Sequence, residues 1–330
     1  MRIVYGAPEG GGWHPITHMV RLMAELFDAE LVTVPLTRPA NAWRRAAALG
    51  PRRRGRDTCL VVAAEPRHLN NLLHADYWLR GYGQVAGWVI DSFWVERIPP
   101  SARRHFDQLF VADKEVAGLW SDATDLPVTW LPWGSDVLRL GSGEGDRPVD
   151  LQRLGRQPAG WEDDEAIRRA CEAAGLRFAG RPPMRDDAGA NQAELMRCLA
   201  RAKFVLAFSN AVSPAPYTHP TREYLTGRWT DSLASGSTVA GVAPKVAATA
   251  ELLWPGALLE LDGTDPAQGI EQIAAAVADW DPQAALDNHR RALDSLDWRW
   301  RFKDLAAALD VTPEPLEAEL DALAGAAQPD

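Results

Sequence analysis

The stretch REYLTGRWTDSLASG, residues 222–236, is the segment from which the rest of the chain can be interpreted. It places two carboxylates, Glu223 and Asp231, eight positions apart, which is just over two turns of a helix. We predict a helix at 224–234, so the first acid lies near the helix start, where amides and the dipole favour anions. Arg222 and Arg228 flank the acids with the charge that phosphate needs. The pattern favours a ligand that combines polyhydroxyl groups with a diphosphate.

Outside this stretch, strands alternate with helices in both halves of the chain. In the first half, apolar and β-branched runs predict strands at 2–5, 30–34, 58–64, 84–90, 108–111 and 127–131, with helices at 15–27 and 112–121. The second half predicts strands at 149–154, 176–179, 203–208, 237–241 and 257–261, and helices at 163–174, 191–202 and 266–280, with a helical remainder at 283–324. Such alternation implies right-handed crossovers and parallel sheets. The fold class is therefore α/β, with two Rossmann-like, doubly wound domains.

Length and charge support a two-domain chain. The 330 residues suit two α/β domains of about 150 residues each. Residues 1–140 carry a net charge of +1 and residues 141–330 a net charge of −11. We expect domains at 1–140 and 141–310 and a C-terminal helix and tail at 311–330. Ligands would bind in an interdomain cleft, at the carboxyl ends of the strands.

Composition excludes several classes of function. A net charge of −10 argues against nucleic-acid binding, and no apolar run approaches the length of a transmembrane helix. The first residues lack the apolar region of a signal peptide, so we expect a cytoplasmic protein. The three cysteines do not follow a zinc spacing, and we expect no bound metal. The arginine-rich run at 52–56 is interpreted as a solvated loop, and peripheral contact with an anionic membrane or acceptor stays open.

A glycine-rich loop follows the first predicted strand. In the segment EGGGWH, residues 9–14, the amides of Gly11 and Gly12 can approach a phosphate closely. Pro15 stands where the dinucleotide fingerprint requires a small residue, which disfavours a nicotinamide oxidoreductase. The alternative is a simple tight turn. Trp13, Trp133 and Trp161 each lie beside a glycine in a predicted loop, where an indole can form the wall of a sugar or base site or pack into the core.

The 222–236 stretch resembles the E-x7-E signature of GT-B fold glycosyltransferases of the family 4 (group 1) type. Glu223 matches the first acid and Asp231 the second. Other landmarks of that family have counterparts in the same order, namely PWGSD at 132–136, LGR at 154–156, FAGR at 178–181 and the strand at 203–210. The chain is also similar to the looser group of spore-protein-type glycosyltransferases.

The resemblance implies an enzyme of the hexosyltransferase kind (EC 2.4) that needs no cofactor. Its donor would be a nucleotide-sugar, a UDP- or GDP-sugar, and an acceptor that the sequence does not identify would receive the sugar with retention. Glu223 would contact the donor sugar and Asp231 the ribose. Gly11 and Gly12 would close on the diphosphate, and Arg156 would be its first cation.

The resemblance leaves some positions open. The family's second diphosphate cation, a lysine, is missing from 157–161, and Arg181, Arg222 or Arg228 could replace it. His219, just before the acids, is a donor contact or a turn residue. His14 and Asp91 follow strands of the first domain and are candidates for the catalytic base or for positioning the acceptor, although Asp91 could equally cap its strand. The alternatives are a catalytically degenerate nucleotide-sugar binding protein and a GT-B epimerase or phosphorylase.

Overall fold

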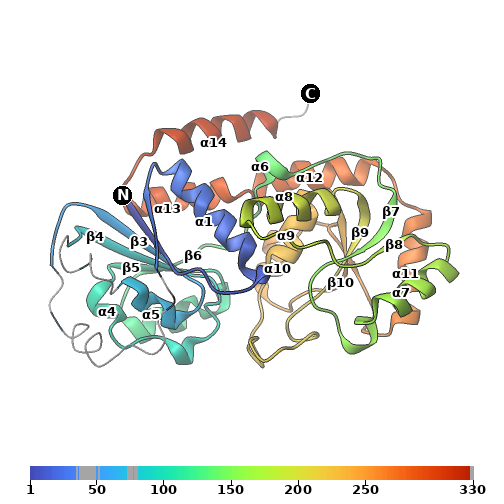
Figure 1. Cartoon of the computed structure of the whole chain (residues 1–330), viewed down its shortest axis with the longest axis horizontal. Coiled ribbons are helices and arrows are strands. Elements are labelled where there is room, and N and C mark those ends of the chain that lie inside the picture. Colours follow the sequence, from blue (N-terminus) through green and yellow to red (C-terminus); the bar gives the residue numbers. More distant parts are fainter. Residues whose placement is uncertain (35, 37–49, 51–52, 73–76, 78–80, 328–330) are drawn as a thin grey trace. The chain divides into compact units, whose positions relative to one another are not determined.

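The computed structural model describes residues 1–34, 36, 50, 53–72, 77 and 81–327 (Figure 1). The chain divides into two compact units, which are described separately below. The first unit comprises residues 1–132 and 301–319, and the second comprises residues 133–300 and 320–330. Among the described residues, none of the helices combines the length and the apolar character that crossing a membrane requires.

The first unit is built on a six-stranded parallel sheet in the order β2-β1-β3-β4-β5-β6. Its strands are β1 (Arg2–Tyr5), β2 (Glu30–Thr33), β3 (Thr58–Ala63), β4 (Gln84–Val89), β5 (Gln108–Val111) and β6 (Val128–Trp130). The strands β3 and β4 are buried almost throughout because they are apolar on both faces, as central parallel strands are. The parallel sheet predicted from the alternation is confirmed.

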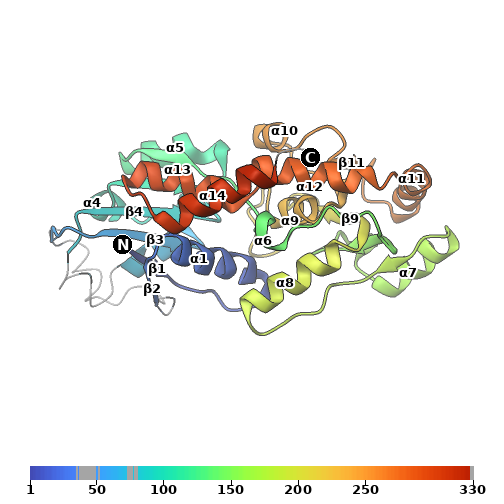
Figure 2. The same cartoon turned by 90° about the horizontal axis from the view of Figure 1, so that it is seen from above.

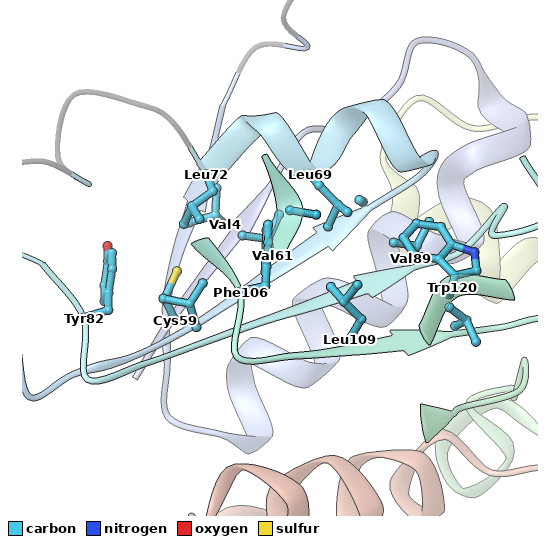
Figure 3. Close-up of a cluster of buried hydrophobic side chains, with 14 of the residues drawn as sticks. Val4, Cys59, Val61, Leu69, Leu72, Tyr82, Val89, Phe106, Leu109 and Trp120 are labelled. Atoms are coloured by element: carbon cyan, nitrogen blue, oxygen red, sulfur yellow. The ribbon is translucent and has the colours of Figure 1, made fainter. Parts of the chain in front are cut away.

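Helices cover both faces of this sheet. They are α1 (His14–Leu26), α4 (Ala102–His105), α5 (Ala117–Thr124) and the part of α13 (Trp298–Leu309) that belongs to this unit, with short 3-10 turns at Gly11–Trp13, Pro66–Leu72, Val95–Arg97 and Lys114–Val116. Figure 3 shows the core on one face, where Leu69, Leu109 and Trp120 pack together. On the other face, Phe302 of α13 meets Phe27 edge to face at 6.2 Å.

The second unit holds a five-stranded parallel sheet in the order β11-β10-β9-β7-β8. Its strands are β7 (Val149–Arg153), β8 (Phe178–Ala179), β9 (Ala202–Phe208), β10 (Thr238–Val242) and β11 (Leu258–Glu260). Its helices are α6 (Val137–Leu140), α7 (Asp164–Ala173), α8 (Ala188–Leu199), α9 (Gly227–Ala234), α10 (Ala247–Leu252), α11 (Pro266–Ala278), α12 (Gln283–Ser295) and the part of α14 (Glu314–Ala326) that belongs to this unit. The core packs α7 and α11 on one face and α8, α9 and α12 on the other, with α9 and α12 side by side (Figure 2).

One sequence expectation about this unit is wrong, and one choice that the sequence left open is decided. The helix expected at 224–234 begins only at Gly227, because Thr226 is extended and Tyr224 and Leu225 are buried in irregular backbone. Trp161 is 1% exposed and packs on Phe208, with ring centroids 5.8 Å apart, so it belongs to the core rather than to a binding wall.

Trp133 is likewise a packing residue. It is 8% exposed and lies beside Trp298, with ring centroids 6.3 Å apart. A Cβ on Gly227 would come within 3.2 Å of the Trp133 ring. A Cβ on Gly269 would likewise lie 2.7 Å from the Trp161 ring, so glycines distant in the sequence leave room for both indoles in the core.

A buried arginine ties together the ends of two helices in the second unit. Arg147 is 3% exposed and donates to the carbonyl oxygens of Ala202 and Ser235, each at 2.7 Å, and to that of Glu144 at 2.9 Å. Burial lowers the pKa of Arg147 to about 10. The carbonyls of Ser235 and of Leu199, which lies 3.5 Å from Nη1, are at the C-terminal ends of α9 and α8, whereas Ala202 begins β9. Carbonyls at helix ends are dipole partners for a cation, so backbone compensates this charge.

A second buried arginine, Arg299, joins two carboxylates. Its Nη1 lies 3.0 Å from Asp136 Oδ1 and 2.9 Å from Asp297 Oδ1, and all three side chains are at most 1% exposed. The backbones meet here too, since Ser135 N donates to Leu296 O at 2.8 Å and Trp298 N donates to Ser135 O at 2.9 Å. The segment at 135–136, near the start of residues 133–300, is therefore bonded to the segment at 296–299, near their end.

The hydrogen bonds to Asp150 on β7 should stabilise the second unit at neutral pH, and this stabilisation should be lost in acid. Burial alone would raise the pKa of Asp150, but hydrogen bonds from Lys203 Nζ at 2.7 Å and Arg177 N at 2.8 Å outweigh burial, and the pKa is lowered. The contribution is therefore present above the unfolded pKa of about 3.9 and is lost as pH falls through the lower folded pKa. Asp150→Asn should cost about 1–3 kcal/mol at neutral pH.

Urea unfolding at a series of pH values checks this expectation. The gap in unfolding free energy between wild type and Asp150→Asn should narrow as the carboxyl group becomes protonated in both states. Asp186→Asn, at an exposed position, is the matched control and should track the wild type at every pH. A gap that stayed constant down to the lowest pH would contradict the assignment.

Candidate functional site

The carboxyl edge of the second sheet brings two arginines onto one neutral acceptor. Arg156 follows β7, Asn210 follows β9, and Arg228 lies in the first turn of α9. The carboxamide oxygen of Asn210 accepts from Arg156 Nη2 at 2.9 Å and from Arg228 Nη2 at 2.8 Å. Two guanidinium groups, 72 positions apart in the sequence, thus converge on a single oxygen atom. We call Arg156, Asn210 and Arg228 the arginine pair site.

A glycine and a backbone carbonyl position the second arginine. Gly155 has a φ of +71°, and a Cβ there would lie 3.0 Å from Cδ of Arg228. Any other residue would be strained and would press on the arginine stem. On the other side, Arg228 Nη1 donates to the carbonyl oxygen of Phe208, the last residue of β9. The guanidinium of Arg228 is therefore fixed from both sides.

The arginine pair site is strongly cationic. Burial and the neighbouring charge of Arg156 lower the pKa of Arg228 to about 10. Among the described residues, neither arginine forms an ion pair with a carboxylate. Arg156 stacks instead on the Tyr217 ring, 4.8 Å from its centroid, and its Nη1 is buried without a hydrogen-bond partner in the described structure. Neutral groups hold both cations, so their charge stays available to an anion.

Glu223 lies at the same sheet edge and joins two of its loops. Its Oε2 accepts from the amide of Ala211, next to Asn210, at 3.2 Å. Its Oε1 accepts from the amide of Lys245, after β10, at 2.9 Å. Each carboxylate oxygen has a second lone pair, so a hydroxyl group can still donate to either. Contact with a donor sugar stays a prediction that this position permits.

Asp231 is placed differently from Glu223. It is 3% exposed on α9, and its Oδ1 accepts from Ser135 Oγ at 2.7 Å. The buried carboxylate therefore links α9 to the segment at 133–136. The ribose contact implied by the family resemblance stays a prediction, and reaching a ribose would require Asp231 to share its oxygens with Ser135.

His219 and Arg222 form a turn that leads into Glu223. His219 Nδ1 accepts from the amides of Thr221 at 3.1 Å and Arg222 at 3.0 Å. The neutral ring therefore carries its proton on Nε2. Arg222 Nη1 lies 3.3 Å from that Nε2, but both atoms carry hydrogens, so this contact is not a hydrogen bond and the backbone amide of Arg222 makes the link to the ring. His219 thus occupies the turn position that the sequence left open, and whether it also contacts a donor stays a prediction.

The three candidates for the second diphosphate cation lie at different places in the second unit. Arg181 is 55% exposed on the loop after β8 and pairs with Glu162 at 2.7 Å. The backbone amide of Arg222 donates to His219 Nδ1, and its guanidinium lies against the same ring. Arg228 shares an acceptor with Arg156, and it is the one of the three that the structure brings to that residue.

The remaining candidates lie in the first unit, at the carboxyl edge of its own sheet. Gly11 and Gly12 form the 3-10 turn after β1, and no described atom would lie within 4 Å of a Cβ on Gly12. His14 begins α1, and its Nδ1 is buried without a hydrogen-bond partner in the described part of the chain. Asp91 follows β4, and its amide donates to Ala64 O at 2.8 Å. Joint action with the second unit stays a prediction.

Asn210 is the residue that sequence reasoning missed. It comes two positions after a buried strand, at the sheet edge where ligands bind in open α/β folds. Arg156 was singled out for the same placement, so a polar residue after β9 carried the same signal. Its role depends on two partners 54 and 18 positions away, which no local pattern shows.

Comparisons with known proteins show the fold. No family model matches the chain, and no curated protein sequence is significantly similar to it. Among solved structures, Anabaena Alr3699/HepE in complex with UDP is similar, with a TM-score of 0.54 and 13% identity over 94% of this chain and 100% of that chain. The same protein in complex with UDP-glucose gives a TM-score of 0.55 and 12% identity over 94% and 99%. The pneumococcal O-GlcNAc transferase GtfA in complex with UDP and GlcNAc gives a TM-score of 0.47 and 12% identity over 82% and 58%.

The likeness to HepE extends over nearly the whole of both chains. Together with the two parallel sheets and the C-terminal helices, it confirms the GT-B fold, with two Rossmann-like domains. At 12–13% identity, the likeness speaks for architecture alone. Function has to be argued from the residues of the site.

Proposed function

We propose that the protein is a glycosyltransferase whose second unit binds a nucleotide-sugar and whose product is a glycosylated acceptor. The observation that carries this proposal is the arginine pair site, where two guanidinium groups share one neutral oxygen at 2.9 and 2.8 Å. Such a site attracts a group with two adjacent negative charges, and a diphosphate has them. The GT-B fold and the resemblance around Glu223 favour a diphosphate that carries a sugar.

The chemistry follows from where charge develops. Breaking the bond between the sugar and the diphosphate builds positive charge at the anomeric carbon and negative charge on the leaving diphosphate. Arg156 and Arg228 are already in place to stabilise that negative charge, and they do so more strongly in the transition state than in the ground state. The buried Nη1 of Arg156 gains an acceptor when a phosphate oxygen arrives.

The finer assignments belong to the same proposal. UDP is the favoured nucleotide because HepE, which shares the fold, was solved with UDP and with UDP-glucose. Glu223 would accept a hydroxyl of the donor sugar, and His14 or Asp91 would serve the acceptor hydroxyl. A retained anomeric configuration follows from the family resemblance, and the acceptor is an open choice among hydroxyl-bearing molecules.

A binding screen followed by product analysis tests the proposal. UDP, GDP, ADP and TDP are compared by calorimetry and by the rise in unfolding temperature that binding to the folded state produces. We expect UDP to bind most tightly and UDP-glucose to be turned over when an acceptor is supplied. The proposal fails if none of the nucleotides binds.

One observation favours a second candidate, a donor-binding protein without transfer activity. Both Glu223 oxygens already accept backbone amides, and Asp231 is engaged with Ser135. This candidate predicts UDP-sugar binding with no turnover on any acceptor. A GT-B epimerase would instead release an isomer or free sugar from labelled UDP-glucose in the absence of acceptor.

Glu223→Gln separates contact with the sugar from contact with the nucleotide. The amide keeps one acceptor oxygen for the loops but removes the charge that a sugar hydroxyl would bind. We expect turnover of UDP-glucose to fall by about 10–100-fold, because a hydrogen bond to a charged group is lost, while UDP itself binds as before. Glu271→Gln, at an exposed position on α11, is the control and should keep full turnover. An equal loss of UDP affinity would mean that Glu223 only supports the loops.

A further inference from the structure

We propose that Asn210 is a positioning residue that holds Arg156 and Arg228 together without neutralising them, and that this makes the site selective for diphosphates. The inference deepens the proposed function and rests on it for the identity of the nucleotide. The role of Asn210 itself does not depend on which nucleotide binds. A neutral amide at this position leaves both positive charges available to the ligand, whereas a carboxylate would neutralise one of them.

The geometry of Asn210 fits such a role. Its side chain is 8% exposed, and one carboxamide oxygen uses its two lone pairs for the two arginines. The backbone beside it is fixed, because Ser209 N donates to Val242 O of β10 at 2.8 Å and the amide of Ala211 donates to Glu223. The acceptor is therefore held rigidly at the sheet edge, and it brings the two guanidinium groups to one point.

An amide instead of a carboxylate at position 210 makes the site less stable when no ligand is bound. Two guanidinium groups near one another repel, and the lowered pKa of Arg228 is consistent with that repulsion and with burial. An aspartate at position 210 would form an ion pair with both arginines and relieve the repulsion permanently. With asparagine, the repulsion between the guanidinium groups persists until an anionic ligand binds. The unliganded protein is therefore less stable, and the ligand binds more tightly.

The same arrangement explains selectivity between phosphates. A diphosphate can place charged oxygens against both guanidinium groups at once, including the buried Arg156 Nη1 that has no partner in the described structure. A monophosphate satisfies one guanidinium well and leaves the second charge uncompensated. We therefore expect UDP to bind more tightly than UMP, by a margin that depends on the net charge of the site.

Asn210→Asp tests the proposal through two effects of opposite sign. The substitution is nearly isosteric, so the shape of the loop is retained. We expect the unfolding temperature of the unliganded protein to rise, while the Kd for UDP increases about tenfold or more and the preference for UDP over UMP shrinks. Asn210→Ala should lower both stability and affinity, because the arginines lose their common acceptor. Asn70→Asp adds the same charge in the first unit and should leave UDP binding unchanged.

The outcomes separate positioning from a merely structural role. If Asn210→Asp lowers the unfolding temperature together with affinity, Asn210 only supports the fold and the proposal is overturned. Unchanged UDP affinity in Asn210→Asp overturns it as well. Inorganic pyrophosphate is measured alongside UDP as a probe without nucleoside or sugar. If the wild type binds pyrophosphate but not UDP, the proposed glycosyltransferase fails, and the response of pyrophosphate binding to Asn210→Asp still decides the role of Asn210.

Discussion

Replacing Arg228 with methionine should raise the Kd for UDP by about 100-fold, the largest effect that we expect for a single change in the arginine pair site. The guanidinium is fixed by Phe208 O and Asn210 Oδ1, so it meets a phosphate without further ordering. Methionine keeps most of the stem packed against Gly155 and removes only the charge and its donors. Calorimetric titration of UDP into the wild type and Arg228→Met gives the two dissociation constants directly.

The expected stability change makes this result specific. Because Arg228→Met also removes the repulsion with Arg156, the unliganded variant should unfold at the same temperature as the wild type or higher. Arg181→Met is the matched control, since Arg181 is exposed and paired with Glu162, and its UDP affinity should stay within about twofold of the wild type. Near-normal UDP binding in Arg228→Met would remove the basis for a diphosphate site here.

Replacing Arg299 with methionine should destabilise the second unit by about 3–5 kcal/mol, because two buried carboxylates lose their common cation. For a unit of this size, the loss corresponds to a fall in unfolding temperature of about 10 °C. Differential scanning calorimetry measures that transition. Arg291→Met, at an exposed position on α12, should leave the unfolding temperature within about 1 °C of the wild type.

Two further measurements distinguish whether Arg299→Met destabilises the unit by leaving buried carboxylate charges unpaired or by removing packing. Burial raises the pKa of Asp297 even though Arg299 opposes the shift, and without the arginine the pKa should rise further. A raised carboxyl pKa means that the folded state binds protons more readily, so the stability of Arg299→Met should recover as pH falls. Adding Asp136→Asn should recover part of the loss at neutral pH. If neither change helps, the arginine acts through packing alone.

The architecture could be predicted from the sequence because its signals are local. Buried runs such as 58–63 and 84–89 are apolar on both faces, and helices with periodic apolar residues separate the strands. The sequence left choices open, or predicted wrongly, where distant residues decide the outcome. Trp133 and Trp161 have loop-like neighbours, yet each packs against an aromatic ring elsewhere in the fold. Thr226 stays extended because Tyr224 and Leu225 are buried in front of it.

The candidate site was partly visible for the same reason. The sequence places Arg156 at the end of a strand. It offered Arg228 as one of three arginines that could be the second diphosphate cation, and it did not select among the three. The distinction comes from Asn210, which only the folded sheet brings to both residues. The arginine-rich run at 52–56 is described in part: Arg53, Arg54 and Arg56 are exposed and Arg52 lies outside the described residues, so contact with an anionic surface stays a prediction.

The contacts of Ser135 and Arg299 determine where the second unit can be cut from the chain. A recombinant fragment that started at Gly141 would leave Arg299 with a single carboxylate and Asp231 without its hydroxyl donor. Starting at Trp133 keeps both partners, because Ser135 and Asp136 are then included. The few residues before α6, which look like a disposable linker, are therefore needed for a fragment suited to nucleotide titrations or crystallisation.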